Sequence, residues 1–265
     1  MRFTLLTGLG GIEDYSAIAR KAEEVGFSSL GMPDSLFYPE ITESDYPYMD
    51  TAAVRTVLDG VPVLDPFVAM AGMAAVTEKL RFYPAVMKVP VRQPLVLAKS
   101  LSSLAVVSGG RVSLGAGLSP WKEDFTFNGV DFERRGAIFD ECLEIIRAAL
   151  SGDYFEHYSE HFAIGRCKLS PVPSAPVPVL IGGHARPALR RAARLGDGWI
   201  SANTDYETLQ GLLASLEEMR RESGTAGRVD GEILGGEVAA PRRVQVGRLE
   251  ALGGADVCVR RWQAG

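Results

Sequence analysis

The chain has 265 residues, with 28 Lys and Arg against 33 Asp and Glu, and a formal net charge of −5. Its 46% hydrophobic content is that of a globular protein, which excludes disordered, collagen-like and coiled-coil chains. Both signs of charge are scattered, so there is no basic stripe for nucleic acid. No stretch approaches the roughly 18 apolar residues of a membrane span, and the first residues lack the apolar region and cleavage site of a signal peptide.

The three cysteines point to the compartment. Cys142, Cys167 and Cys258 are far apart and odd in number, which favours free thiols over a disulfide or zinc framework. We therefore predict a cytoplasmic protein without a metal site.

Short apolar runs alternate with longer amphipathic ones along the chain. Asp65 and Pro66 are typical of a helix start, as N-cap and first helical residue. The predicted strands are 3–7, 28–32, 80–87, 111–117, 177–181, 197–201, 232–234 and 256–260. The predicted helices are 13–25, 65–77, 93–107, 133–150, 186–195 and 205–222, with a further short helix before the last strand.

Three segments depart from this rhythm. Residues 33–64 are rich in Pro, Tyr and acids, and an irregular stretch of this length favours a functional loop over a site. Its aromatic residues are expected either to form a lid or to pack on the rim of the fold. Residues 151–176 indicate a hairpin followed by an extended segment, and the part after residue 222 is weakly patterned.

The fold class follows from the alternation. Strands that alternate with helices form a parallel sheet, and eight such units in about 250 residues favour a closed (β/α)8 TIM barrel over an open doubly wound sheet. We find no interdomain linker, so residues 1–265 are predicted to form a single domain.

In such barrels the site lies at the C-terminal ends of the strands. This rule selects five groups of residues in the predicted barrel. They are Asp34 and Ser35, Ala85 to Lys88, Gly117 to Trp121, Gly182 to His184, and Ser201 to Asn203.

The segment VPVLIGGHARPALRRAA at 177–193 is the clearest local signal. Gly182 and Gly183 follow an apolar strand, and a helix begins near Pro187. Glycines allow close backbone approach, and a helix N-terminus with free N–H groups suits a phosphate. The same pattern is also typical of a tight turn whose glycines serve geometry alone.

Four blocks carry a family resemblance. They are VGFSSLGMPD at 25–34, RQPLVLAK at 92–99, GGRVSLGAGLSPWKEDFTFNGVDFERRGAIFDE at 109–141, and IGGHARPALRRAARLGDGW at 181–199. Together they resemble the bacterial luciferase-like superfamily, and most closely its oxidoreductases that depend on the deazaflavin coenzyme F420. The resemblance covers about residues 1–222, and four ordered blocks are far more specific than one motif.

The resemblance implies a (β/α)8 barrel with an insertion before strand five, a homodimer, and a flavin or deazaflavin in the pocket at the strand ends. It also implies a non-proline cis peptide at Ala85–Val86, pressed against the back of the tricyclic ring. The cofactor-binding residues carried over are Asp34, Ala85, Val86, Met87, Gly117, Leu118, Ser119, Gly182, Gly183 and His184. Other matching positions are expected to be scaffold: Arg92, Lys99, Trp121, Glu123, Arg135 and Asp140.

Some positions differ from the family's sugar-phosphate dehydrogenases. Ser35 and Pro120 stand where that branch has a histidine and a glutamate for proton transfer, and Asp205 replaces a lysine for substrate phosphate. A serine is no unassisted base near neutral pH. We therefore do not expect sugar-phosphate substrates, and we assign no catalytic residue from the sequence.

Residues 157–161 spell H-x-x-E-H, a zinc-peptidase pattern that requires a helix. Because the segment lies in the predicted hairpin, we do not interpret it as a metal site.

Three functions remain open at this point. The first is hydride transfer between F420 and a small organic substrate. The second is a monooxygenase that uses reduced FMN, with Arg186 available near the phosphate turn. The third is a cofactor-free barrel that acts as a binding protein, suggested by the weakly patterned C-terminal part.

Overall fold

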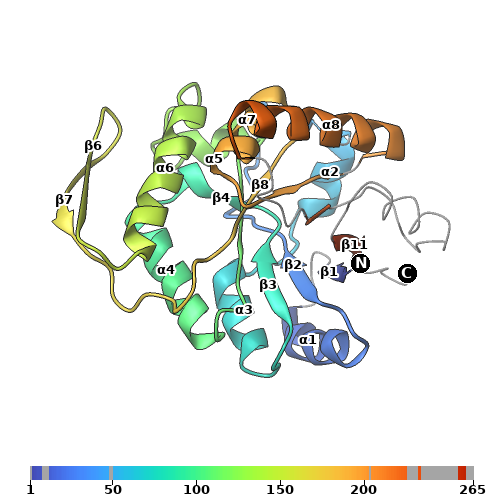
Figure 1. Cartoon of the computed structure of the whole chain (residues 1–265). Coiled ribbons are helices and arrows are strands. Elements are labelled where there is room, and N and C mark those ends of the chain that lie inside the picture. The colour runs from blue at the N-terminus through green and yellow to red at the C-terminus, as the bar shows by residue number, and fades with distance from the viewer. Residues whose placement is uncertain are drawn as a thin grey trace.

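The computed structural model describes residues 2–7, 12–47, 50–202 and 204–225, together with the backbone of 232–233 and 256–260. Within these residues none of the helices has the length and apolar character needed to cross a membrane. Figure 1 shows strands in the middle of the molecule and helices around them.

Two parallel sheets form the centre. The first has the order β10-β11-β1-β2-β3 and the second the order β4-β5-β8-β9. The strands of the first sheet are β1 (Arg2–Leu6), β2 (Ser29–Met32), β3 (Arg81–Pro84), β10 (Glu232–Ile233) and β11 (Asp256–Arg260). Those of the second are β4 (Met87–Lys88), β5 (Leu114–Gly117), β8 (Val179–Gly182) and β9 (Gly198–Ile200).

The predicted strand 80–87 joins the two sheets. Its first half, β3, pairs with β2, and its second half, β4, pairs with β5. A parallel bridge between Phe82 and Val112 also connects them, and Cα atoms of β9 and β10 lie within 8 Å of each other on the opposite side. The strand order and the parallel pairing are those of a (β/α)8 TIM barrel, as the sequence predicted.

Long helices follow the strands and cover the barrel. They are α1 (Tyr15–Glu24), α3 (Pro66–Ala74), α4 (Pro94–Val107), α6 (Arg135–Leu150), α7 (Arg186–Leu195) and α8 (Tyr206–Glu222). Asp65 caps α3 as predicted, because its carboxylate accepts hydrogen bonds from the backbone N–H groups of Phe67 at 2.9 Å and Val68 at 3.2 Å. Met70 and Met73 of this helix are fully buried.

Two short helices correct the sequence prediction. The loop 33–64, predicted to be irregular, contains α2 (Thr51–Leu58), whose N-cap Asp50 accepts a hydrogen bond from Ala53 N at 2.8 Å. The segment after β5 forms α5 (Lys122–Thr126). Neither helix buries a full apolar stripe, so the helical period was too weak to see. Two 3-10 turns, η1 (Ile12–Asp14) and η2 (Val89–Val91), precede α1 and α4.

The predicted hairpin before strand five is present. It consists of β6 (Phe155–Tyr158) and β7 (Ala163–Cys167), which pair antiparallel and project from the barrel beside α6 (Figure 1). His157 therefore lies on a strand, with Nε2 3.2 Å from Glu141 Oε2. The helix predicted before the last strand lies outside the described residues.

Apolar side chains fill the barrel interior. Tyr83, Leu180 and Ile200 form a buried cluster, and Leu6, Ala85 and Val86 pack against it. A larger cluster separates the strands from the surrounding helices. Because barrels of this size have packed interiors, the space for a ligand lies above this cluster, at the strand ends.

Candidate active site at the strand ends

Val86 lies where three strands end. A Cβ added to Gly117 would be 2.4 Å from Val86 Cγ2, and one added to Gly182 would be 2.8 Å from Val86 Cγ1. Both glycines are thus required by the close approach of Val86. The Ala85–Val86 peptide is cis, which confirms the cis bond implied at this position. The start of β4 and the ends of β5 and β8 therefore meet around the side chain of Val86.

Asp34 holds the segment that follows Val86. Its carboxylate binds both terminal nitrogens of Arg92 at 2.7 Å and accepts a hydrogen bond from Lys88 N at 2.8 Å. The side chain of Asp34 is 1% exposed, so its oxygens face protein groups. Arg92, predicted to be scaffold, forms this charge pair. Through these contacts Asp34 holds β4 in place.

A second buried charge pair joins β4 to α5. Lys88 Nζ is 2.6 Å from Asp124 Oδ2, and both side chains are almost completely buried. Ser119 donates a hydrogen bond to the same carboxylate and accepts one from Trp121 N at 3.1 Å. Lys88 was among the strand-end residues selected from the sequence, but Asp124 was not, because the two residues meet only when α5 packs against β4.

The turn after β8 is built as the sequence predicted. Gly183 has φ +114°, a left-handed conformation that favours glycine, and its carbonyl accepts a hydrogen bond from Trp199 Nε1 at 2.9 Å. The first turn of α7 contains Pro187 and has no side-chain cap. Pro187 has no N–H and Ala188 N already donates to Ala185 O at 2.8 Å, so Arg186 N is the N–H of the first turn that could bind a ligand.

His184 joins this turn to the end of β9. Its Nε2 accepts a hydrogen bond from Ala202 N at 2.9 Å and lies 3.2 Å from Ser201 Oγ. Burial lowers the pKa of His184. The ring is therefore neutral near pH 7, with its proton on Nδ1, and acts as an acceptor that ties two strand ends together.

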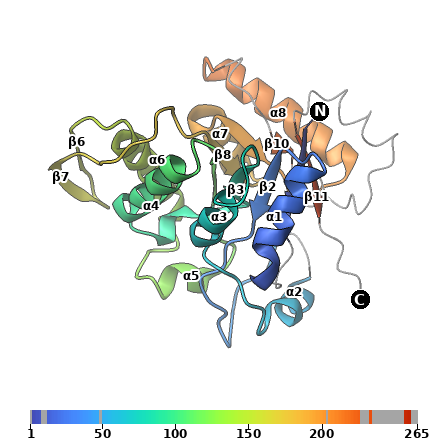
Figure 2. The ribbon, with the colours of Figure 1, turned by 90° about the horizontal axis from the view of Figure 1, so that it is seen from below.

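The loop 33–64 is attached to the segment after β5. Glu123 accepts hydrogen bonds from Glu43 N at 3.0 Å and Ser44 Oγ at 3.3 Å. The rings of Tyr46 and Trp121 stack with centroids 5.5 Å apart. Figure 2 shows α2 and α5 at the same end of the molecule. These aromatic contacts agree with the prediction that the aromatic residues of the loop pack on the rim of the fold. The loop also lines a small cavity of about 130 Å³.

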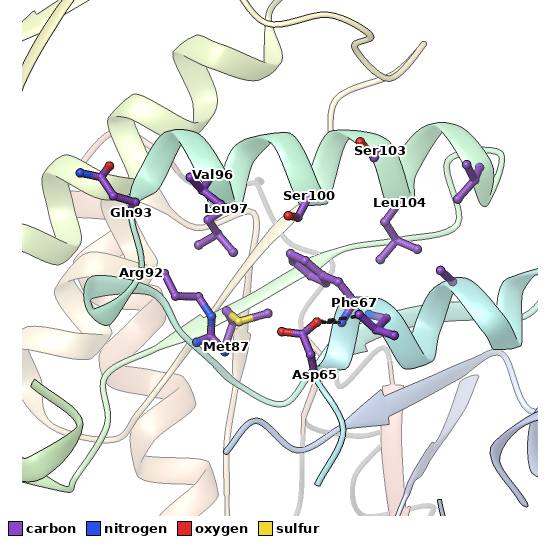
Figure 3. A pocket seen from close by; sticks show the side chains of 13 residues that line it. Asp65, Phe67, Met87, Arg92, Gln93, Val96, Leu97, Ser100, Ser103 and Leu104 are labelled. Carbon is purple, nitrogen blue, oxygen red and sulfur yellow. Dashed lines mark hydrogen bonds between the residues drawn. The ribbon is translucent and has the colours of Figure 1, made fainter. Parts of the chain in front are cut away.

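A larger cavity, of about 590 Å³, lies between α3 and α4, outside the barrel. Figure 3 shows Phe67, Leu97 and Leu104 pointing into it from the two helices, and Met87 contributes from β4. Met87 thus lies on the opposite face of its strand from Val86. Among the predicted cofactor-binding residues, Met87 is the one whose position agrees least with contact to the cofactor.

The structure brings most of the other predicted residues together. Ala85, Val86, Gly117, Gly182 and Gly183 surround one strand-end region, and Leu118 packs against the main core. Several scaffold predictions are also confirmed. Lys99 donates to Ser170 O, Arg191 pairs with Asp140, and the guanidinium of Arg135 lies over Phe132.

The family model described as luciferase-like monooxygenase matches residues 3–248. The chain belongs to this family. It is 41% identical over 259 residues to the uncharacterised protein Rv0940c of Mycobacterium tuberculosis. The alignment covers 98% of this chain and 88% of that protein. It is 26% identical to pyrimidine monooxygenase RutA of Allorhizobium ampelinum, over 76% of this chain and 57% of RutA.

Solved structures support the luciferase-like barrel fold. An F420-dependent secondary alcohol dehydrogenase, in complex with an F420-acetone adduct, superposes with a TM-score of 0.77 at 16% identity, covering 98% of this chain and 92% of the other. The monooxygenase RslO1 from Streptomyces bottropensis superposes with a TM-score of 0.72 at 19% identity, covering 95% and 77%. Members of this family are oxidoreductases and monooxygenases.

Proposed function

We propose that this luciferase-like protein transfers a hydride between coenzyme F420 and a small organic substrate bound at the strand ends. The observation that carries the proposal is the convergence of Val86, Gly117 and Gly182 beneath the barrel mouth. The two glycines make room for Val86, and the partly exposed Ala85 and Val86 form a small apolar surface, which suits a flat ring. A deazaflavin, when bound, supplies or accepts the hydride, and the protein orients the substrate.

The turn after β8 fits the cofactor's phosphate. Gly183 adopts a left-handed conformation next to the uncapped start of α7. Several N–H groups in such a turn, together with the positive end of a ten-residue helix, attract a phosphate. This supports placing the phosphate at Gly183 and the ring against Ala85 and Val86.

The remaining residues at the site hold its shape. The pair of Asp34 and Arg92 fixes β4, and neutral His184 fixes the phosphate turn against β9. The loop 33–64, joined to α5 through Glu123, packs on the rim of the barrel, where it would limit the access of water to the substrate.

Titration of the purified protein with F420, followed by cofactor fluorescence, tests the proposal. We expect saturable binding that weakens about tenfold in Gly183→Ala, because a Cβ is strained at φ +114° and lies 3.0 Å from Ala188 Cβ. Gly129→Ala is the matched control, with φ +69° and no atom within 4 Å of its new Cβ. Absence of F420 binding at low salt would remove the proposal.

An FMN-dependent monooxygenase is the second candidate. The similarity to pyrimidine monooxygenase RutA favours it, and Arg186 begins α7 beside the phosphate turn. Oxygen consumption with FMN, a flavin reductase and a panel of substrates tests this candidate. Substrate-dependent uptake, with tighter binding of FMN than of F420, would replace the first proposal by the second.

The third function, a cofactor-free binding protein, loses the observation that suggested it. Strands β10 and β11 from the weakly patterned part pair with each other, and β11 also pairs with β1. The last barrel strands are therefore present in the sheet. A colourless protein that binds neither F420 nor FMN would restore this alternative.

We also propose that the protein is a homodimer in the reducing cytoplasm. The groove between α3 and α4 exposes Val68, Val96 and Val107, each by about two thirds, and contiguous exposed apolar surface favours an interface. Cys142 and Cys167 are free thiols, which suits a reducing compartment. Light scattering would show a monomer if the interface is absent.

A further inference from the structure

Lys88 lies on the face of its strand that looks into the barrel. Val86 packs against the interior cluster, and Met87 lines the outer groove between α3 and α4. Because successive side chains of a strand alternate between faces, Lys88 returns to the face of Val86. Its position in the cavity beneath the loop 33–64 agrees with this alternation. The charged side chain of Lys88 therefore lies two residues beyond Val86 on the same face of the strand.

The ammonium group of Lys88 has donors to spare. An ammonium carries three N–H bonds, and within the described part of the chain its one partner is Asp124, at 2.6 Å. The carboxylate of Asp124 is better satisfied, since it also accepts the hydroxyl proton of Ser119. A buried cation with unused donors is suited to a ligand oxygen.

The cavity around this ammonium group is small, and its walls are about equally polar and apolar. Its volume of about 130 Å³ is that of roughly four water molecules in the liquid. Lys88 and Asp124 form its polar end. The walls come from the loop 33–64, α2 and the residue before α5, and include Phe37, Tyr38, Leu58, Val61, Val63 and Trp121. Such a space holds a short aliphatic body and is too small for a tricyclic ring.

The charges that face the cavity sum to a positive value. Lys88 and Arg55 are cationic, and Asp124 is anionic. The guanidinium of Arg55 already donates to the carbonyl oxygens of Pro39 and Glu40 and lies 4.6 Å from the ring centroid of Tyr38. Lys88 is thus the cation available to a ligand, and the excess positive charge favours an anion.

We propose that this cavity is a subsite for a short-chain carboxylate, with the carboxylate on Lys88 Nζ and the aliphatic part against Leu58 and Val63. The inference rests on the proposed function in one respect, namely that the bound acid is the substrate or part of it. Asp124 and Ser119 position the ammonium. The subsite gives the enzyme a preference for small substrates that carry an acid group.

Calorimetric titration of the protein with butyrate and with its neutral isostere butyramide tests the subsite. We expect butyrate to bind the wild type about tenfold more tightly than butyramide. Asp124→Asn removes one negative charge and so raises the net charge of the cavity by one. Butyrate should therefore bind this variant about tenfold more tightly than the wild type. In the double variant Lys88→Met/Asp124→Asn the preference for butyrate over butyramide should disappear.

Asp197→Asn is the matched control. It makes the same change in an Asp that pairs with Arg147 at 2.8 Å, outside the cavity, and should leave both affinities unchanged. Equal binding of the two compounds to the wild type, or no binding of butyrate, would overturn the subsite even if the variants fail to fold. F420 titration of the wild type separates the two proposals, because a wild type that binds F420 but does not bind butyrate contradicts the subsite alone.

Discussion

Val86 occupies the space that a side chain at Gly117 would need. The position of an added Cβ is 2.4 Å from Val86 Cγ2, closer than non-bonded carbon atoms approach. Gly117 at the end of β5 and the branched residue Val86, between β3 and β4, are therefore one packing unit. This unit, with Gly182 on its other side, shapes the floor of the proposed cofactor site.

Gly117→Ala should destabilise the protein by about 1–3 kcal/mol through overpacking. Val86→Ala should recover part of this loss when combined with it, because it removes the methyl groups in conflict. Gly211→Ala on α8, where a Cβ meets no atom within 4 Å, should instead stabilise by roughly 0.5–1 kcal/mol. Urea unfolding measures all three. Additive effects of the Gly117 and Val86 changes would contradict the packing unit.

Asp34→Asn should destabilise the protein by about 3 kcal/mol, because Arg92 would keep its charge in a buried position without a partner. The double variant Asp34→Asn/Arg92→Leu removes both charges and should recover part of this stability. Thermal unfolding of the two variants is the measurement. If the single variant melts like the wild type, the pair does not hold β4.

Stability should fall in mild acid because of His184. Burial lowers the pKa of this ring in the folded protein, so protons bind the unfolded chain more strongly. The contribution is fully present above the unfolded pKa of about 6.5 and is lost as the pH falls toward the folded pKa. His184→Asn keeps an acceptor for Ala202 N and does not titrate. Its melting temperature should therefore drop less between pH 7.5 and 5, and an equal drop would refute this role.

The loop 33–64 should loosen when Glu123 is replaced. Glu123→Ala removes the acceptor for Glu43 N and Ser44 Oγ, so hydrogen exchange of residues 40–46 should accelerate severalfold. Glu144→Ala changes an exposed residue on α6 and should leave this segment unaffected. Unchanged exchange in Glu123→Ala would mean that other contacts hold the loop.

Local signals made much of the fold predictable. Asp65 and Pro66 mark the start of α3 because a cap and a proline act on adjacent residues. The strand predicted at 177–181, observed as β8 (Val179–Gly182), and the helix that begins near Pro187 were likewise visible from an apolar run, two glycines and a proline. The helix α5 was missed because five residues give no measurable helical period.

The site was less predictable because its contacts are distant in sequence. Asp34 was expected near the cofactor, and only the fold shows that Arg92 and Lys88 N take its oxygens. Lys88 gave no signal of its own, since its partner Asp124 comes from α5, which is distant in sequence. The strand-end rule did place Lys88 in the correct region, which shows that topology narrows the search to a few residues before geometry selects among them.

The most direct test of the account is a crystal structure of the protein with F420 bound. The account predicts the deazaflavin ring against Ala85 and Val86, with the phosphate at Gly183 and the start of α7. A ring bound elsewhere, or strand ends filled by side chains with F420 excluded, would contradict it.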